Sequence, residues 1–174
     1  MTSQSEEQPF REGMRRLAGA VTIVTAGEGE TAVGMTATAV CSLSMDPPRL
    51  LACINRFGAM FRKLSPNTRF CVNLLPAGAR SVAERFAGST AQSGAQRFDP
   101  AQWLCEPGFS PRLAKATSAI ACTVHSLTVL ETHAIVVGSV EGVWNAEEDT
   151  APLVYHQQAF RTLCPLGEDQ PQVA

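Results

Sequence analysis

The chain has 174 residues, of which 45% are hydrophobic and 17% are charged, and its formal net charge is −2. This composition is typical of a single globular domain and excludes a disordered or fibrous chain. The small net charge argues against nucleic acid or an anionic membrane surface as a partner, because either usually requires a basic face.

No apolar run approaches the length of a membrane span. The stretch 1–8 is polar and acidic, and it lacks the basic and apolar regions of a secretory signal. We therefore expect a cytoplasmic protein with no membrane partner.

The first third of the chain predicts a helix followed by strands. Phe10, Met14 and Leu17 recur at helical spacing, which predicts a helix over residues 9–18 with one apolar stripe. Residues rich in β-branched side chains predict strands, which we expect over 20–26, 31–45 and 49–54.

Residues 27–32 (GEGETA) match the G-x-G-x-x-A pattern of dinucleotide-binding proteins. That motif must open a helix, whereas the residues that follow here alternate with period two, as in a strand. The sequence therefore predicts a hairpin turn over 27–30 and no dinucleotide fingerprint.

The rest of the chain adds helical segments and more strands. We expect helical segments over 56–64 and 79–87, and strands over 69–75, 119–130, 132–144 and 153–156. Residues 89–111 look irregular, with Phe98 and Trp103 as anchors, and the tails 1–8 and 166–174 are expected to fray. Because strands do not alternate with helices, we expect one mainly β domain, a closed or split antiparallel barrel.

Six cysteines stand at positions 41, 53, 71, 105, 122 and 164. They form no C-x-x-C pair and no histidine pair accompanies them, so a zinc site is not expected. We expect reduced thiols, those in apolar runs acting as small hydrophobic side chains.

The segment 34–44 (GMTATAVCSLS) points to a ligand. If it forms one strand, one face is wholly apolar and the other carries the hydroxyls of Thr36, Thr38, Ser42 and Ser44 without any charge. Such a face suits a flat ligand with polar edges. A sheet covered on both faces, or one paired with another subunit, would explain it equally well.

Other polar residues stand at strand ends. Asn55 and Asn73 lie in or next to apolar strands, and the cations Arg56, Arg62 and Lys63 surround an expected helix start at 57–59 that suits a phosphate. A solvated helix face explains these charges as well. His133 opens an apolar strand, and Tyr155 and His156 end the last one, where a structural role is the alternative to a ligand contact.

Taken in order, these segments resemble the short-chain NAD(P)H:flavin oxidoreductases, the reductase components of two-component flavin-dependent monooxygenases, such as that of 4-hydroxyphenylacetate 3-monooxygenase. The resemblance covers residues 10–163. The segments that carry it are FREGM (10–14), AVTIVT (20–25), GMTATAVCS (34–42), DPP (46–48), CIN (53–55), CVNLL (71–75), RFAG (85–88), RF (97–98) with Trp103, and TH (132–133).

The resemblance implies an FMN-binding split β-barrel of Greek-key-like antiparallel strands that forms a homodimer. It implies contacts to a bound flavin, FMN or FAD, from Met35, Thr36, Ala37, Thr38, Ala39, Cys53, Asn55, Arg56, Gly58, Ala59, Asn73, Arg85 and Phe86. It also places His133 beside the nicotinamide or the flavin ring. From their position at the end of the last strand, Tyr155 and His156 are expected as further nicotinamide contacts.

Two departures from the family pattern stand near these positions. Glu131 occupies a place where many relatives carry glycine. Relatives also often carry a small hydroxylated or amide residue where Phe57 or Gly58 stands here. The first departure bears on the local backbone shape and the second on the phosphate contacts.

The implied reaction is hydride transfer from C4 of NADH or NADPH to N5 of the flavin, and the reduced flavin would serve a partner monooxygenase. This chemistry needs no triad, carboxylate pair or metal cluster, and the sequence offers none. The alternatives are an enzyme like pyridoxamine-phosphate oxidase, a flavin-storage protein and a structural subunit. NADH against NADPH, and FMN against FAD, stay open.

Overall fold

The computed structural model describes residues 4–88, 91–148 and 150–165. Its helices are α1 (Gln4–Arg15), α2 (Ala59–Lys63) and α3 (Arg80–Phe86), with 3-10 turns η1 (Gly29–Thr31), η2 (Ala77–Ala79) and η3 (Gly94–Arg97). Its strands are β1 (Gly19–Ala20), β2 (Thr22–Ala26), β3 (Val33–Ala37), β4 (Val40–Met45), β5 (Pro48–Asn55), β6 (Arg69–Leu74), β7 (Trp103–Leu104), β8 (Arg112–Leu113), β9 (Ser118–Leu130), β10 (His133–Asn145), β11 (Leu153–His156) and β12 (Ala159–Thr162). None of the helices in these ranges has both the length and the apolar character needed to cross a bilayer.

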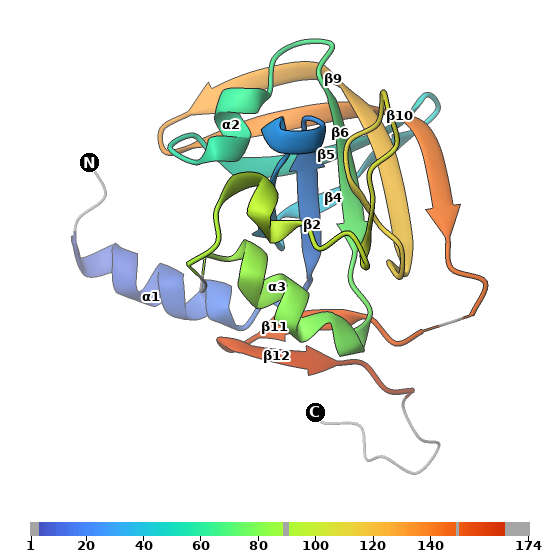
Figure 1. The fold of residues 1–174 in the computed structure, drawn as a ribbon. Coiled ribbons are helices and arrows are strands. Elements are labelled where there is room, and N and C mark those ends of the chain that lie inside the picture. Colours follow the sequence, from blue (N-terminus) through green and yellow to red (C-terminus); the bar gives the residue numbers. More distant parts are fainter. Residues whose placement is uncertain (1–3, 89–90, 149, 166–174) are drawn as a thin grey trace.

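Seven antiparallel strands form the central sheet, in the order β3-β2-β6-β9-β10-β5-β4. The sheet curls, and its two edge strands, β3 and β4, follow one another directly in the chain (Figure 1). One apolar core gathers side chains from all seven of these strands, among them Val24, Ile54, Phe70 and Val136. The expected mainly β architecture is confirmed. Closure into a barrel is not, because no ladder joins β3 to β4 among the described residues.

A second core lies on the opposite face of the sheet, where α3, β7, β8 and β11 cover it. Ile23 belongs to this core and its neighbour Val24 to the first, as the alternation of a strand requires. The rings of Phe86, Phe98 and Trp103 pack with centroids 5.0–5.2 Å apart. Phe98 and Trp103 therefore anchor the segment 89–111 as predicted, although it also contains η3 and β7.

The predicted strand over 31–45 is in fact two strands that meet at a corner. β3 ends at Ala37 and β4 begins at Val40, and both of these residues face the first core although they are three positions apart. Thr38 and Ala39 thus shift the alternation by one residue, and the prediction of one continuous hydroxyl face is wrong. The chain must turn here because β3 pairs with β2 while β4 pairs with β5.

The predicted helix over 9–18 corresponds to α1, which begins earlier and ends earlier. An ion pair of 2.7 Å between Glu7 and Arg11 spans Pro9 and supports the first turns, so residues 4–8, expected to fray, belong to a helix in this structure. The remaining positions of both predicted tails, 1–3 and 166–174, lie outside the described residues.

The apolar stripe of this segment does not reach either core. Phe10 is 70% exposed, Met14 49% and Leu17 65%. In Figure 1, α1 projects away from the sheet. Its C-terminal end is held by the Gln157 N–H, which donates to the Arg15 carbonyl over 2.8 Å.

The other predicted elements occur with shifted ends. The strand expected over 20–26 divides at Val21, because β1 pairs with β11 in a separate three-stranded sheet. The helix expected from residue 56 begins only at Ala59, after a tight turn. β9 and β10 pair along almost their full length. The turn over 27–30 joins two antiparallel strands, which confirms that GEGETA does not open a phosphate-binding helix.

All six cysteines are free thiols. Cys71 and Cys122 are buried, and burial raises the pKa of each thiol to about 12. Cys41, Cys105 and Cys164 are exposed. Within the described ranges, no group of three or more side chains is arranged to hold a metal ion.

Candidate functional site

A groove of about 380 Å³ opens between β3, α3 and the β11–β12 pair. Its size lies within the range of small-molecule sites. The residues that line it are Val21, Thr36, Ala37, Thr38, Glu84, Ala87, Tyr155 and Phe160. The groove therefore brings three predicted flavin contacts, from β3 and its corner, together with Tyr155, a predicted nicotinamide contact.

One wall of the groove is aromatic. Tyr155 and Phe160 face each other across β11 and β12, with their rings edge to face at 5.3 Å. Gly19 stands opposite Tyr155 on the neighbouring strand. An aromatic pair of this kind offers a surface against which a flat ring system can pack.

The opposite wall joins β3 to α3. The Thr36 hydroxyl donates to the Ala83 carbonyl over 2.6 Å, so its proton is already engaged. Thr38 is exposed at the end of this wall. At the rim, Glu84 forms a 2.8 Å ion pair with Arg80. This wall thus offers one free hydroxyl and one paired charge.

A polar corner adjoins the groove through Thr38 and Ala39. We use the name polar corner for Ala39, Cys53, Asn55, Arg56, Thr132 and His133. The Ala39 carbonyl accepts the Cys53 N–H over 2.9 Å. Two residues further along β5, Asn55 stands opposite His133 on β10. The two ladders therefore place His133 and the start of β4 on opposite sides of β5, and the two are about 90 positions apart in sequence.

Asn55 organises the loop that leads to α2. Its side-chain oxygen accepts the Phe57 N–H over 2.9 Å, and its carbonyl accepts the Gly58 N–H over 3.2 Å. These two amides are the ones expected to cradle a phosphate, and both are engaged within the loop. The positive charges of Arg56, Arg62 and Lys63 remain around it, which leaves side chains rather than the Gly58 amide to attract an anion.

The same loop holds the tip of the β9–β10 hairpin. The Arg56 N–H donates to the Thr132 carbonyl over 3.1 Å, and its guanidinium donates to the Glu131 carbonyl over 3.0 Å. Glu131 has φ = +48°, in the left-handed region that favours glycine. The glycine that relatives carry at this position therefore fits the shape of the turn.

Asn73 and Phe86, both predicted flavin contacts, are buried in the cores, and these predictions are corrected. The Asn73 amide donates to the Ile23 carbonyl over 3.1 Å, and its oxygen accepts the Leu113 N–H over 2.8 Å. Phe86 belongs to the aromatic cluster of the second core. Asn73 is covered because β6 is a central strand with a core on each face. Neither side chain lines the groove.

The remaining predicted contacts lie around these two features. Met35 packs against the first core, and Arg85 is half-buried on α3. Ala59 is exposed at the start of α2. His156 is half-buried and pairs with Ala159. β10 begins at His133, and Figure 1 draws this end of the strand on the side of α2, whereas β11, which carries Tyr155 and His156, is drawn at the other end of the molecule.

The prediction from sequence missed four groove residues, namely Val21, Glu84, Ala87 and Phe160. Phe160 was missed because the short strand β12 was not expected. The alternation of the residues after 158 (AFRT) and their separation from Tyr155–His156 by two glutamines are the signals that could have shown a second hairpin.

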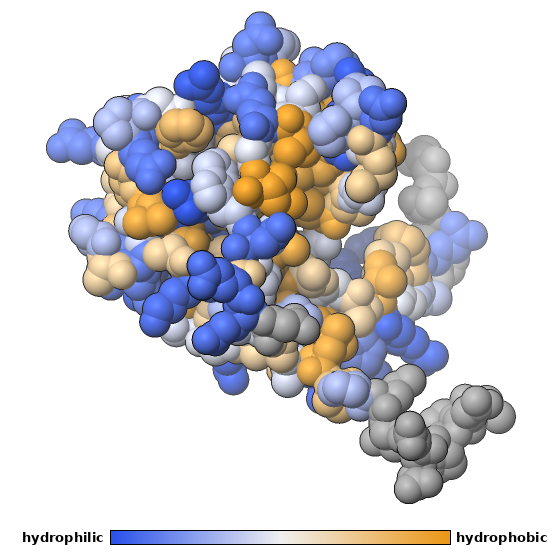
Figure 2. All heavy atoms as spheres, turned by 90° about the vertical axis from the view of Figure 1, so that its right-hand side faces the viewer, coloured by the Kyte–Doolittle hydropathy of each residue, from blue (hydrophilic) through white to orange (hydrophobic). Residues whose placement is uncertain are grey.

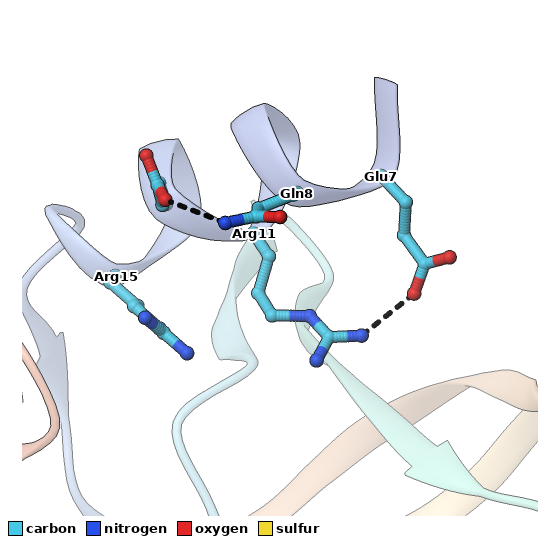
Figure 3. Close-up of a pocket in the computed structure, with 5 residues that line it drawn as sticks. Glu7, Gln8, Arg11 and Arg15 are labelled. Atoms are coloured by element: carbon cyan, nitrogen blue, oxygen red, sulfur yellow. Dashed lines mark hydrogen bonds and ion pairs between the residues drawn. The ribbon is translucent and has the colours of Figure 1, made fainter. Parts of the chain in front are cut away.

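A second hollow lies along α1 and carries no comparable features. Figure 3 shows this space of about 420 Å³, which is lined by Glu7, Gln8, Arg11, Glu12 and Arg15. Glu7 pairs with Arg11, and the Gln8 amide donates to Glu12. One exposed helix supplies all of these residues, so the hollow does not enclose a ligand.

Comparisons with known proteins identify the family. Residues 14–164 match the family described as "Flavin reductase like domain". The chain is 35% identical over 159 residues to the FMN reductase (NADH) RutF of Cronobacter sakazakii, a match that covers 91% of this chain and 94% of that protein.

Solved structures show the same fold. A flavin reductase domain protein from Arthrobacter sp. FB24 matches with a TM-score of 0.83 and 30% identity, over 94% of this chain and 99% of that one. Nitrilotriacetate monooxygenase component B from Mycobacterium thermoresistibile matches with a TM-score of 0.81 and 25% identity, over 98% and 92%. The chain therefore belongs to the flavin reductase family, whose members are NAD(P)H:flavin oxidoreductases.

Proposed function

We propose that the protein reduces FMN with NADH or NADPH, by hydride transfer to N5, and supplies the reduced flavin to a partner monooxygenase. The name of the Cronobacter relative supports FMN and NADH as the pair to test first. The nitrilotriacetate monooxygenase component supports a partner oxygenase. Because NAD(P)H is the reductant, we place the reaction in the cytoplasm.

The observation that carries this proposal is the composition of the groove and the adjoining polar corner. The groove offers an aromatic wall at Tyr155 and Phe160 and an exposed hydroxyl at Thr38. The polar corner adds the positive charge of Arg56, and Arg62 and Lys63 follow on α2. A flavin mononucleotide has a flat ring with one polar edge and a charged phosphate, so these residues fit its parts.

When bound, FMN supplies N5 as the acceptor of the hydride that NAD(P)H donates from C4. The protein's residues position the reactants. Val21 and Ala37 exclude water from the floor of the groove, and Tyr155 supports a ring from one side. Holding two reactants in contact makes their reaction effectively unimolecular. His133 is exposed at the polar corner, where its imidazole can hydrogen-bond a carbonyl oxygen of either reactant.

The test is the loss of absorbance at 340 nm when purified protein is mixed with NADH or NADPH, with and without FMN, FAD or riboflavin. We expect a loss of absorbance that depends on added flavin. The rates for all nucleotide and flavin combinations rank the nucleotides and the flavins as substrates. A yellow protein that oxidises neither nucleotide would favour a storage protein or an enzyme like pyridoxamine-phosphate oxidase. A colourless, inactive protein would favour a structural subunit.

The partner oxygenase requires its own test. A flavin-dependent monooxygenase purified without its reductase should turn over its substrate when this protein, FMN and NADH are all present. Omission of any one should stop the reaction. Turnover with chemically reduced FMN, but none with this protein, FMN and NADH, would contradict the proposed supply role.

We also propose that the protein forms a homodimer, which would cover apolar surface that one chain leaves open. Such surface includes the α1 stripe of Phe10, Met14 and Leu17. Val143 and Trp144 are also exposed at the end of β10. Figure 2 shows hydrophobic residues gathered on the face at the right of Figure 1. Light scattering should give twice the chain mass of 18.6 kDa, and a single-chain mass would contradict the dimer.

A further inference from the structure

The tip of the β9–β10 hairpin is fixed from one side. Arg56 donates to the carbonyls of both Glu131 and Thr132, from its guanidinium and its backbone N–H. The left-handed conformation of Glu131 is compatible with few other arrangements of the turn. The backbone of Thr132 is therefore held in place, and this limits where its side chain can reach.

The Thr132 hydroxyl lies 2.9 Å from Nδ1 of His133. A neutral imidazole has one nitrogen that donates and one that accepts, and the hydrogen bond made at one nitrogen fixes the role of the other. An unprotonated ring nitrogen is a stronger acceptor than a hydroxyl oxygen. The favoured arrangement therefore has the hydroxyl as donor to Nδ1, with the ring proton on Nε2.

We propose that Thr132 is a positioning residue that holds His133 as the Nε2–H tautomer and fixes the direction of its ring. This rests on the proposed function, in which His133 contacts the nicotinamide or the flavin. An Nε2–H group donates to a carbonyl oxygen, and both the carboxamide of the nicotinamide and the polar edge of the flavin provide one. Without the hydroxyl, the exposed imidazole would rotate and exchange between tautomers.

The tautomer can be measured directly and without any substrate. The chain has three histidines, so protein labelled with ¹⁵N-histidine gives three imidazoles, and the spectrum of His133→Ala identifies the one at issue. At alkaline pH we expect the wild-type His133 nitrogens to show a single Nε2–H form. Thr132→Val should show averaged shifts of two tautomers. Identical spectra for the two proteins would overturn the proposal.

Steady-state kinetics then test whether the fixed tautomer of His133 affects the reaction rate. Loss of one hydrogen bond that forms in the transition state lowers the rate constant by a factor of about three to ten. We expect kcat of Thr132→Val to fall by about that factor, with KM for FMN nearly unchanged. Thr132→Ser, which keeps the hydroxyl, should restore both kcat and the single tautomer.

Thr128→Val is the matched control, because Thr128 is exposed on β9 of the same hairpin and lies outside the polar corner. It should behave as wild type. A Thr132→Ser variant as slow as Thr132→Val would overturn the role of the hydroxyl. A wild-type protein that fails to reduce any flavin would instead overturn the proposed function, and the spectra would still decide whether Thr132 sets the tautomer.

Discussion

Two regions of the strand β10 differ in burial: its middle is tightly packed and its first residue is exposed. Gly138 is buried, and a Cβ added there would lie 2.5 Å from Cζ of Phe70 and 3.0 Å from Cβ of Cys122. His133, five positions earlier, is exposed at the end of the same strand. The comparison indicates a division of tasks. The packed region fixes the shape of the sheet, and the open end presents side chains to ligands from that rigid support.

Alkaline pH should strongly destabilise the packed region. Burial raises the pKa of Cys71 and of Cys122 from 9.0 to about 12, so both stay protonated in the folded state while unfolded thiols ionise. Their contribution to stability is complete below pH 9 and is lost as the pH rises toward 12. At pH 10 the pair should reduce the free energy of unfolding by about 2–3 kcal/mol.

Urea unfolding at pH 8 and pH 10 measures this loss. Replacing both buried thiols, as in Cys71→Ala with Cys122→Ala, should reduce the pH dependence, whereas replacing the exposed thiol in Cys41→Ala should leave it intact. An unchanged pH dependence in the double variant would show that other groups cause the loss.

Asn73→Ala should destabilise the packed region by about 2–4 kcal/mol. It removes the partner of the buried Leu113 N–H and of the Ile23 carbonyl, and buried groups left without partners are costly. Chemical denaturation gives the free energy of unfolding. A loss below about 0.5 kcal/mol, the usual size for a surface substitution, would mean that the amide does not hold β8 against the sheet.

Gly138→Ala should cost about 1–3 kcal/mol, because the added methyl must displace the Phe70 ring. Gly78→Ala is the control, since a Cβ there meets no atom within 4 Å. The difference between their unfolding midpoints isolates the crowding. Equal midpoints would contradict the tight packing described for β10.

His133→Ala should affect activity and not stability, unlike the variants of the packed region. We expect its turnover to fall roughly tenfold, with an unchanged free energy of unfolding. The side chain is exposed and supports neither core. Steady-state NADH oxidation and denaturation on the same preparation separate the two quantities. Full activity of the variant would remove His133 from the site.

Glu131→Gly should have the smallest effect, a gain of roughly 0.5–1 kcal/mol in stability. The residue has φ = +48°, which glycine adopts without strain. Thermal unfolding detects this gain as a small rise in Tm. Lower stability would show that the Glu131 side chain makes a favourable interaction at the tip.

The sequence could predict the elements whose signals are local. The apolar runs of β5, β6, β9, β10 and β11 were located within a residue or two, because apolar burial leaves a pattern along the chain. The corner at Thr38 was not predicted. In the sequence, apolar and polar residues appear to alternate without a break from β3 into β4. Only the pairing of β3 with β2 and of β4 with β5 shows that the inward-facing positions shift by one residue between the two strands.

Individual site residues could be proposed from local sequence patterns, but their spatial arrangement could not. Thr38 is exposed and Asn55 pairs with His133, so these residues stay candidates, but the proximity of Asn55 to His133 depends on the register of β5 against β10. Asn73 shows the limit of sequence patterns. A polar residue in an apolar strand predicts either a ligand contact or a buried hydrogen bond, and only the position of Leu113 decides between them.

The most direct test is the rate of FMN bleaching after protein, FMN and NADH are mixed without oxygen, compared for wild type, His133→Ala and Gly78→Ala. We expect fast bleaching with wild type and Gly78→Ala, and roughly tenfold slower bleaching with His133→Ala at an equal unfolding midpoint. A wild-type rate no higher than that of NADH and FMN alone would contradict the assignment of the groove and the polar corner as a flavin reductase site.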